Sequence, residues 1–254
     1  MPDVPIRKPP PPFRAVEVIR TEPLTPRMMR VVVGGAALDG FGQPEPASSI
    51  RVVIPWPGDE FELPEWTGNE FLLADGRRPA LRTFTPVTFD AAAYEMTFDI
   101  VRHPGGAIST WAETAGPGDP VAVSGPGRSE VIDPEASRAI VVGDETAIPA
   151  IRQLIETTPA SIALDITIEV TTPEAELPLP DRDGCEVRWS VLDPTHAPGT
   201  ALLPPVVAAE IGPDDRVWAA GEAAGVQRIR KHLKERDVPR QHTTVRGYWK
   251  VPRD

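Results

Sequence analysis

The first half of the chain carries short runs in which apolar and polar residues alternate, separated by turns rich in glycine and proline. The clearest run is Tyr94–Val101, where apolar and polar side chains alternate over nearly the whole length, as they do on a half-buried β-strand. Six such strands over about 110 residues predict a small antiparallel β-barrel. The predicted strands are Phe13–Ile19, Arg27–Val33, Ile50–Ile54, Leu81–Thr85, Tyr94–Val101 and Pro120–Ser124.

The pattern changes at Arg138. A continuous apolar run over residues 139–142 ends in Gly143, which is typical of a strand buried in a parallel sheet, and a helical stripe of isoleucine and leucine follows it. A second such unit leads from Arg216 through Gly221 into a basic helix. Repeated strand, glycine turn and helix predict an open parallel α/β sheet. Further strands are predicted at Ser161–Val170, Cys185–Val191 and His242–Tyr248, and the helical stripes are Ile148, Ile151, Leu154 and Ile155, then Val226, Ile229 and Leu233.

We therefore expect three parts in a β plus α/β protein. A proline-rich N-terminal arm covers residues 1–12, a six-stranded antiparallel β-barrel covers 13–134, and a parallel-sheet α/β domain of the nucleotide-binding type covers 135–254, with the boundary near Asp133–Ser137. The chain contains 32 prolines, many of them in the arm or between predicted elements, which indicates rigid connections.

Composition narrows the classes of function. A net charge of −11 argues against a nucleic-acid partner, because phosphate binding needs a dominant basic face. The single cysteine, Cys185, excludes an intrachain disulfide and an iron–sulfur cluster, so electron chemistry needs an organic cofactor or a metal on other ligands. The four histidines show no spacing typical of a metal site. No apolar run approaches ~18 residues and no signal peptide is evident, so we expect a cytoplasmic protein without membrane insertion.

The run Leu81–Pro86 combines a cation, an aromatic ring and hydroxyl groups. On an extended strand Arg82 and Phe84 share one face, while Thr83 and Thr85 share the other. A flavin nucleotide fits the first face, because arginine binds its phosphates and the ring covers its apolar surface. The alternative is an ordinary surface strand.

A second candidate segment runs from His103 to Ala112. Its glycines open a predicted helix whose free backbone N–H groups suit a pyrophosphate, and Ser109 offers a hydroxyl. The alternative is a glycine turn followed by a helix cap, in which Trp111 is a core residue.

Together these segments resemble the flavin-binding half of the ferredoxin reductase superfamily and, more closely, the siderophore-interacting proteins, which are FAD-dependent ferric-siderophore reductases. That family carries an Arg-x-Tyr-Thr motif and then a His-containing loop of the form Gly-Pro-Ala-Ser-x-Trp-Ala. The matching segments are Arg82–Thr85, Gly106–Ala112, Pro117–Asp119, Ser124–Arg128, Gly143–Ala150, Ala220–Ala223 and Gly247–Lys250.

The resemblance implies a role for each segment. Arg82 would pair with the FAD phosphates, Phe84 would stack on the flavin ring, and Thr85 would bond near its N5 atom. Segment 143–149 would meet NADH or NADPH, with Asp144 and Glu145 facing ribose hydroxyls. The implied cofactor-binding residues are Arg82, Thr83, Phe84, Thr85, His103, Gly106, Ala107, Ser109 and Thr110 for FAD, and Asp144, Glu145 and Thr146 for the nicotinamide nucleotide.

Three positions depart from the family pattern. Phe84 replaces the usual tyrosine, Val87 stands where a second arginine is common, and Ala107 replaces the loop proline. These changes remove a hydroxyl and an anion contact, so the sequence predicts weaker retention of FAD.

The resemblance also implies a substrate site, because ferric siderophores are often anionic. The matching cations are Arg51, Arg128 and Lys250, although each could be a solvated surface charge. Local charge governs docking at short range even in an acidic protein. The denser run Arg228, Arg230, Lys231, Lys234 and Arg236 is spread round a helix by its spacing, and we interpret it as an exposed face.

The resulting hypothesis is a monomeric FAD-dependent reductase of ferric siderophores that draws electrons from NAD(P)H or a reduced ferredoxin and uses no side chain as acid or base. A general flavin-dependent NAD(P)H oxidoreductase is one alternative. A siderophore-binding protein without redox activity is the other.

Overall fold

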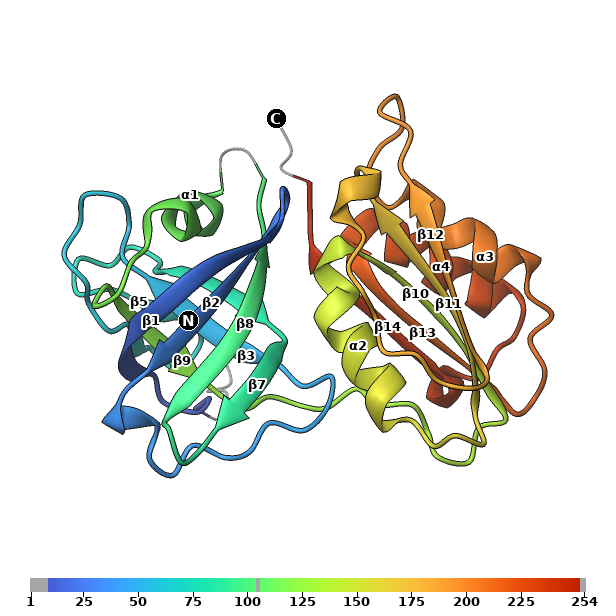
Figure 1. Cartoon of the computed structure of the whole chain (residues 1–254), viewed down its shortest axis with the longest axis horizontal. Coiled ribbons are helices and arrows are strands. Elements are labelled where there is room, and N and C mark those ends of the chain that lie inside the picture. Colours follow the sequence, from blue (N-terminus) through green and yellow to red (C-terminus); the bar gives the residue numbers. More distant parts are fainter. Residues whose placement is uncertain (1–8, 104–105, 252–254) are drawn as a thin grey trace, which may run out of the picture. The chain divides into compact units, whose positions relative to one another are not determined.

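The computed structural model describes residues 9–103 and 106–251. The chain forms two compact units, Met1–Ser129 and Glu130–Asp254, drawn from blue to red in Figure 1. The division falls shortly before the predicted boundary at Asp133–Ser137. Most of the predicted arm, residues 1–8, lies outside the described residues, while the carbonyl of Pro11 accepts a 2.6 Å hydrogen bond from the hydroxyl of Ser124.

The N-terminal unit is built on a seven-stranded sheet in the order β6-β3-β9-β1-β2-β8-β7, and every pairing in it is antiparallel. The two edge strands are consecutive in the chain, and Thr85 alone separates them. β6 also contacts β8, the neighbour of β7, so the sheet curls round into a barrel although β6 and β7 do not pair with each other. The strands are β1 (Arg14–Thr25), β2 (Met28–Gly34), β3 (Ile50–Ile54), β6 (Ala80–Phe84), β7 (Pro86–Asp90), β8 (Glu95–Val101) and β9 (Pro120–Ser124).

The antiparallel barrel confirms the predicted fold class, but the predicted count of six strands is wrong. The sequence reading took Pro86 as the end of a strand, whereas it begins β7 and pairs with Phe98. A proline is tolerated there because β7 is an edge strand and the missing N–H costs no ladder bond. A two-stranded sheet of β4 (Glu65–Trp66) and β5 (Phe71–Leu72) was also missed, because two residues show no alternation.

Most strand limits differ from the prediction by one or two residues, and two differences affect the barrel. β1 continues past Ile19 to Thr25, with register shifts that carry it through Pro23. Tyr94 precedes β8 with a left-handed φ of 54° and is 36% exposed, so it turns the chain and is not a core residue. The rest of the predicted alternation is confirmed, since Met96, Phe98 and Ile100 lie in the barrel core.

Helix α1 (Ala107–Thr114) confirms the helix predicted after the glycines. Ile108 and Ala112 are buried in the barrel core, and Trp111 packs against that core. The helix contacts both β6 and β8. The remaining short turns of the chain are the 3-10 helices Ala36–Leu38, Glu145–Ala147, Pro173–Ala175, Thr200–Leu202 and Arg240–His242.

The C-terminal unit is a parallel five-stranded sheet in the order β12-β11-β10-β13-β14, which confirms the predicted α/β architecture. Helix α3 was not predicted, because Pro204 and Pro205 read as helix breakers although they occupy its first turn, where proline is tolerated. The strands are β10 (Arg138–Asp144), β11 (Ala163–Val170), β12 (Cys185–Val191), β13 (Asp215–Glu222) and β14 (Thr243–Trp249), and the helices are α2 (Ile148–Thr157), α3 (Leu203–Ala208) and α4 (Ala223–Glu235).

The helices cover both faces of this sheet (Figure 1). On one face, Val206 of α3 and Ile229 of α4 share a core with Val142 of β10. The neighbouring residue Gly143 faces the other way, where a Cβ would meet Ile151 of α2 at 2.9 Å. Since β11 and β13 flank β10 on opposite sides, the strand order reverses at β10, and ligands of open α/β sheets bind at the carboxyl ends of such strands.

No helix within the described ranges is long and apolar enough to cross a membrane.

Candidate functional site

The β3–β6 pairing sets the faces of the predicted flavin strand. Val52 pairs with Arg82 and Ile50 pairs with Phe84, and partners across a ladder project to the same face. The half-buried ring of Phe84 lies 5.2 Å from the ring of Phe98, between centroids, at the margin of the core. The Arg82 side chain is exposed and donates to the carbonyl of Leu81 at 2.7 Å.

Arg82 differs from many other arginines of this chain. Arg30, for example, bonds Asp99 through two nitrogens at 2.8 and 2.9 Å. Within the part of the chain that the structure describes, Arg82 has no carboxylate partner. Its charge is therefore not neutralised by the protein, as an anion-binding residue requires.

The two threonines of the run Leu81–Pro86 lie in different surroundings. Thr83 is exposed and pairs with Arg51, on the face opposite to that of Arg82. Thr85 is buried at the junction of β6 and β7, with 8% of its surface exposed.

The predicted pyrophosphate loop joins β8 to α1, and its residues 104 and 105 lie outside the described residues. Gly106 is the N-cap of α1 and makes no side-chain cap bond, and among the described residues no side-chain bond to the first N–H groups of the helix is recorded. A Cβ at Gly106 would lie 2.4 Å from Cε1 of His103, so the imidazole lies directly against the glycine. The buried hydroxyl of Ser109 accepts from the backbone N–H of His103 at 3.1 Å, while Ala107 is half-buried and Thr110 is exposed.

These features suit FAD. Because α1 contacts β6, the structure brings the two predicted FAD segments together. The Arg82 guanidinium, which has no carboxylate partner among the described residues, and the start of α1 can both bind phosphate. The half-exposed ring of Phe84 can pack against a flat ring system.

The predicted substrate cation Arg51 is half-buried, and burial lowers the pKa of its guanidinium. Its Cζ lies 5.9 Å from the ring centroid of Phe71, a cation–π geometry. The ring of Phe71 also makes edge-to-face contacts with two other rings. The centroid distances are 4.9 Å to Phe13 and 5.1 Å to Trp66. Arg51 therefore lies against one ring of a small aromatic cluster, on the face of β3 opposite to the core residue Val52.

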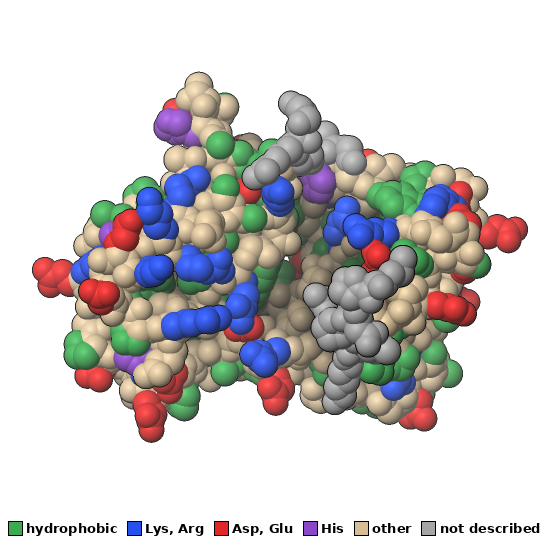
Figure 2. All heavy atoms as spheres, turned by 180° about the vertical axis from the view of Figure 1, so that it is seen from behind, with side chains coloured by type: hydrophobic (Ala, Val, Ile, Leu, Met, Phe, Trp, Pro, Cys, Tyr) green, Lys and Arg blue, Asp and Glu red, His purple; other side chains and the backbone are tan. Residues whose placement is uncertain are grey.

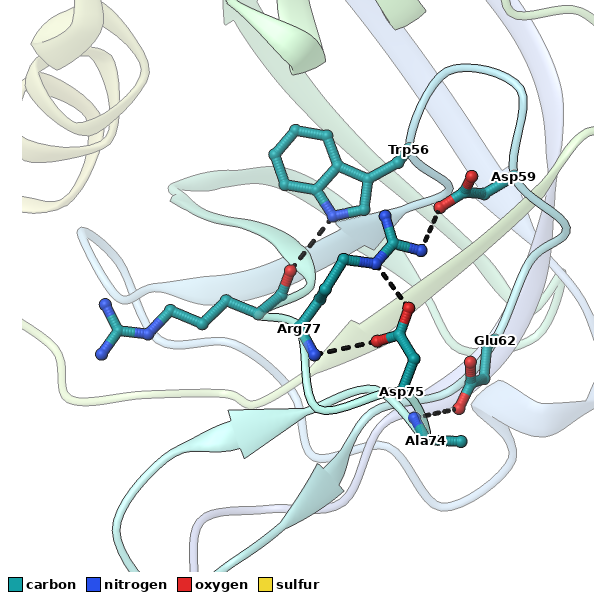
Figure 3. A network of polar contacts seen from close by, with 7 residues as sticks. Trp56, Asp59, Glu62, Ala74, Asp75 and Arg77 are labelled. Atoms are coloured by element: carbon teal, nitrogen blue, oxygen red, sulfur yellow. Dashed lines mark hydrogen bonds and ion pairs between the residues drawn. The ribbon is translucent and has the colours of Figure 1, made fainter.

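The loop that carries Phe71 is fixed by polar contacts, shown in Figure 3. Arg77 pairs with Asp59 at 2.7 Å and also bonds Asp75, while the indole of Trp56 donates to the carbonyl of Arg78 at 3.1 Å. Glu62 accepts from the backbone N–H of Ala74 at 2.6 Å. These bonds hold the excursion between β3 and β6 as a defined loop.

The other two predicted substrate cations are exposed. Arg128 follows β9, and the nearby N–H of Gly127 donates to the carbonyl of Ser49 at 2.6 Å, so Arg128 and Arg51 lie toward the same end of β3. Lys250 belongs to the C-terminal unit and directly follows β14.

In the C-terminal unit, Asp144 lies at the carboxyl end of β10 and is almost fully buried. Its Oδ1 accepts from the backbone N–H and the hydroxyl of Thr146 at 2.9 and 2.5 Å. Its Oδ2 accepts from the N–H of Glu222 and from the indole of Trp249, each at 2.7 Å. Burial raises the pKa of Asp144 to about 6, although these hydrogen bonds act in the opposite direction.

Three further buried carboxylates tie the loops at this edge of the sheet. Glu145 accepts from the N–H of Thr171 at 2.6 Å, and Glu222 accepts from that of Gly225 at 2.8 Å. Glu169 accepts from the N–H of Gly199 at 2.6 Å. Asp144 and Glu145, predicted to face ribose, are thus engaged within the protein, and Thr146 is the partly exposed member of the predicted trio.

Sequence reasoning missed Glu169 and gave no role to Glu222 and Trp249, although both lie in segments that match the family. The available signal was positional, because Glu169 is next to last in β11 and Glu222 and Trp249 end β13 and β14. The carboxyl ends of parallel strands meet at one edge of the sheet.

The basic run on helix α4 is exposed, as predicted, with Val226, Ile229 and Leu233 buried beneath it. Figure 2 shows Lys and Arg side chains gathered on the C-terminal unit, at the left of that view. The exposed cations of the helix and its end are Arg228, Arg230, Lys231, Lys234 and Arg236.

An antiparallel barrel followed by a parallel α/β unit is the architecture of ferredoxin reductase-like proteins. A solved structure described as the ferredoxin reductase in carbazole 1,9a-dioxygenase superposes with a TM-score of 0.68 at 16% identity, over 97% of this chain and 70% of that one, which shows the fold.

Closer comparisons define the family. Residues 17–130 match the model of the siderophore-interacting FAD-binding domain, and residues 136–251 match that of the siderophore-interacting protein. The crystal structure of a siderophore utilization protein from T. fusca has a TM-score of 0.85 and 33% identity, over 98% of this chain and 96% of that one. The NADPH-dependent ferric-chelate reductase of Escherichia coli is 29% identical over 93% of this chain and 92% of its own length. The chain belongs to the siderophore-interacting protein family.

Proposed function

We propose that this protein is an FAD-dependent reductase of ferric siderophores, which uses NADH, NADPH or a reduced ferredoxin as donor and releases Fe(II) in the cytoplasm. The observation that carries the proposal is that β6, which carries Arg82 and Phe84 on one face, contacts α1, whose N-cap is a glycine without a side-chain cap. The name of the Escherichia coli relative, a ferric-chelate reductase, supports the same activity.

In this proposal Arg82 binds the diphosphate of FAD through its guanidinium fork, and the first N–H groups of α1 donate to the same group. Phe84 covers one face of the flavin ring. The chemistry that bound FAD would supply is uptake of two electrons from a nicotinamide and their transfer one at a time. Oxidation of one NAD(P)H to NAD(P)⁺ and a proton therefore reduces two Fe(III) to two Fe(II).

The side chains bind and orient in this scheme, and none transfers a proton to iron. Arg51, Arg128 and Lys250 supply positive charge for an anionic ferric chelate, and the ring of Phe71 lies against the Arg51 guanidinium. In this proposal the hydroxyl oxygen of Thr146, partly exposed at the carboxyl edge of the parallel sheet, accepts a hydrogen bond from the donor nucleotide, since its own proton is donated to Asp144.

The assignment of Arg82 is tested with Arg82→Ala. Removing a charge-assisted hydrogen-bond donor costs about 1.5–3 kcal/mol, so the Kd for FAD is expected to rise roughly ten- to hundredfold. Fluorescence titration of the FAD-free protein with FAD measures the change.

Arg78→Ala is the matched control, because Arg78 is another exposed arginine of the same unit, paired with Glu70 at 2.7 Å. Exposed ion pairs contribute little, and the FAD affinity of this variant should match the wild type. Equal FAD affinity in Arg82→Ala would remove the proposed role of Arg82.

Steady-state assays distinguish the siderophore reductase from a general flavin oxidoreductase. We expect ferric chelates to be reduced with higher kcat/KM than quinones, with one of NADH, NADPH or a reduced ferredoxin as the preferred donor. Equal turnover of quinones and ferric chelates would favour the general enzyme.

A further inference from the structure

The end of strand β14 is irregular. Gly247 pairs with Gly221 of β13, but the next pair is Glu222 with Trp249, so Tyr248 is an extra residue in the ladder. Bulges of this kind re-aim the side chains that follow them and occur often beside active sites. Trp249 is the last residue of the strand.

A single carboxylate holds the re-aimed indole. Oδ2 of Asp144 accepts from Trp249 Nε1 at 2.7 Å, the short distance of a charge-assisted hydrogen bond. A Cβ on Gly221 would lie 2.5 Å from the same oxygen, so only glycine admits the carboxylate at this place. The position of the Trp249 indole therefore depends on the bulge, on Gly221 and on Asp144 together.

The same carboxylate also holds the loop after β10. Its other oxygen accepts from the N–H and the hydroxyl of Thr146. Asp144 therefore joins the segment proposed to meet the donor nucleotide to the end of β14.

Lys250 comes directly after the held residue. Among the described residues no strand pairing continues past Trp249, and Lys250 is exposed. Among the residues up to 251 that the structure describes, the Trp249 indole bond is the last hydrogen bond recorded between this end of the chain and the sheet. Fixing the indole reduces the conformations open to the adjoining lysine, which lowers the entropy lost when that lysine binds an anion.

We propose that Asp144 is a positioning residue for substrate binding, which holds the Trp249 indole and thereby presents Lys250 to an anionic ferric chelate. This inference rests on the proposed function, because Lys250 is the cation assigned there to the substrate. Neither Asp144 nor Trp249 touches the chelate in this account.

The test is Trp249→Phe, which removes the indole donor and keeps an aromatic ring. For ferric EDTA, an anionic chelate, KM is expected to rise about fivefold at unchanged kcat, because the lost hydrogen bond acts on binding alone. KM for an uncharged ferric trihydroxamate and Kd for FAD are expected to stay at the wild-type values. An unchanged KM for ferric EDTA, or an equal rise for both chelates, would overturn the positioning role.

Trp218→Phe is the matched control. It removes another indole hydrogen bond of the same unit, a 2.8 Å bond to the carbonyl of Glu130, from a fully buried residue. This variant is expected to lose stability and to keep both KM values.

Lys250→Ala distinguishes failure of this inference from failure of the proposed site. If Lys250→Ala raises KM for ferric EDTA but Trp249→Phe does not, the positioning role is wrong and the substrate assignment stands. If Lys250→Ala leaves KM unchanged, both are wrong.

A spectroscopic readout follows the indole itself. In protein labelled with 5-fluorotryptophan, the ¹⁹F resonance that disappears in Trp249→Phe belongs to Trp249. We expect Asp144→Asn to shift that resonance and to leave that of Trp218 in place. A Trp249 resonance unmoved by Asp144→Asn would contradict the hydrogen bond on which the proposal depends.

Discussion

Asp144 accepts four hydrogen bonds while it is nearly removed from water. Its pKa rises to about 6 because burial penalises the charged form more than these bonds favour it. Between pH about 4 and about 6 the folded protein therefore binds a proton that the unfolded chain has released. The stability contributed by this group is highest below that window and falls as the pH rises through it.

Asp144→Asn is expected to remove this pH dependence. From the pKa of about 6, the difference in unfolding free energy between wild type and variant should change by about 3 kcal/mol from pH 4 to pH 7, with the wild type losing stability relative to the variant. Urea denaturation of the C-terminal unit across this pH range measures it. A difference that stays constant with pH would show that Asp144 titrates normally.

The single residues of the candidate site were partly predictable from sequence. The alternation rule placed Arg82 and Phe84 on one face, and the β3–β6 register agrees. It could not show that Asp144 and Glu145 turn inward, because an acidic pair after a strand has the same pattern whether it meets a ligand or a backbone N–H. Such pairings depend on loops that are distant in sequence.

At the scale of elements, helix α4 packs so closely that a glycine is required. A Cβ at Gly225 would lie 2.7 Å from the carbonyl oxygen of Gly199 and 3.0 Å from its Cα. Both are backbone atoms of the loop before α3, and that loop is held by Glu169.

Gly225→Ala is therefore expected to destabilise the C-terminal unit by about 1–3 kcal/mol, although alanine favours a helix over glycine by about 1 kcal/mol. Thermal or urea denaturation shows directly whether the substitution raises or lowers the free energy of unfolding. Gly116→Ala is the control, because a Cβ there meets no atom within 4 Å and should change stability little. A stabilised Gly225→Ala would contradict the close packing.

Most elements followed from periodicity, and apart from the two-residue strands β4 and β5 the missed elements have one physical cause. Strand β7 begins with a proline at an edge position, and helix α3 has Pro204 and Pro205 in its first turn, where the missing N–H has no structural partner to lose. Whether proline ends or begins an element depends on its neighbours in space. That information was absent from the local pattern.

At the scale of the whole molecule, the net charge of −11 opposes an anionic substrate, whereas Arg51, Arg128 and Lys250 attract it. Salt screening distinguishes the repulsion by the net charge from the attraction by the three cations. The Debye length falls from about 30 Å at 0.01 M salt to about 10 Å at 0.1 M, so added salt weakens whichever of the two governs the encounter. The sequence provided both the charge and the candidate cations, but not their mutual arrangement.

We expect kcat/KM for ferric EDTA to fall several-fold as salt rises from about 0.01 to about 0.1 M, since local cations dominate at close approach. For an uncharged ferric trihydroxamate it should stay constant. A rise for ferric EDTA would show that the net negative charge governs the encounter and that the three cations lie away from the substrate.

The most direct test of the central claim is an anaerobic absorbance titration of the FAD-reconstituted protein. After chemical reduction with dithionite, addition of a ferric siderophore should restore the absorbance of oxidised flavin and yield two Fe(II) for each flavin. A protein that binds no FAD, or whose reduced flavin persists after the ferric siderophore is added, would contradict the account.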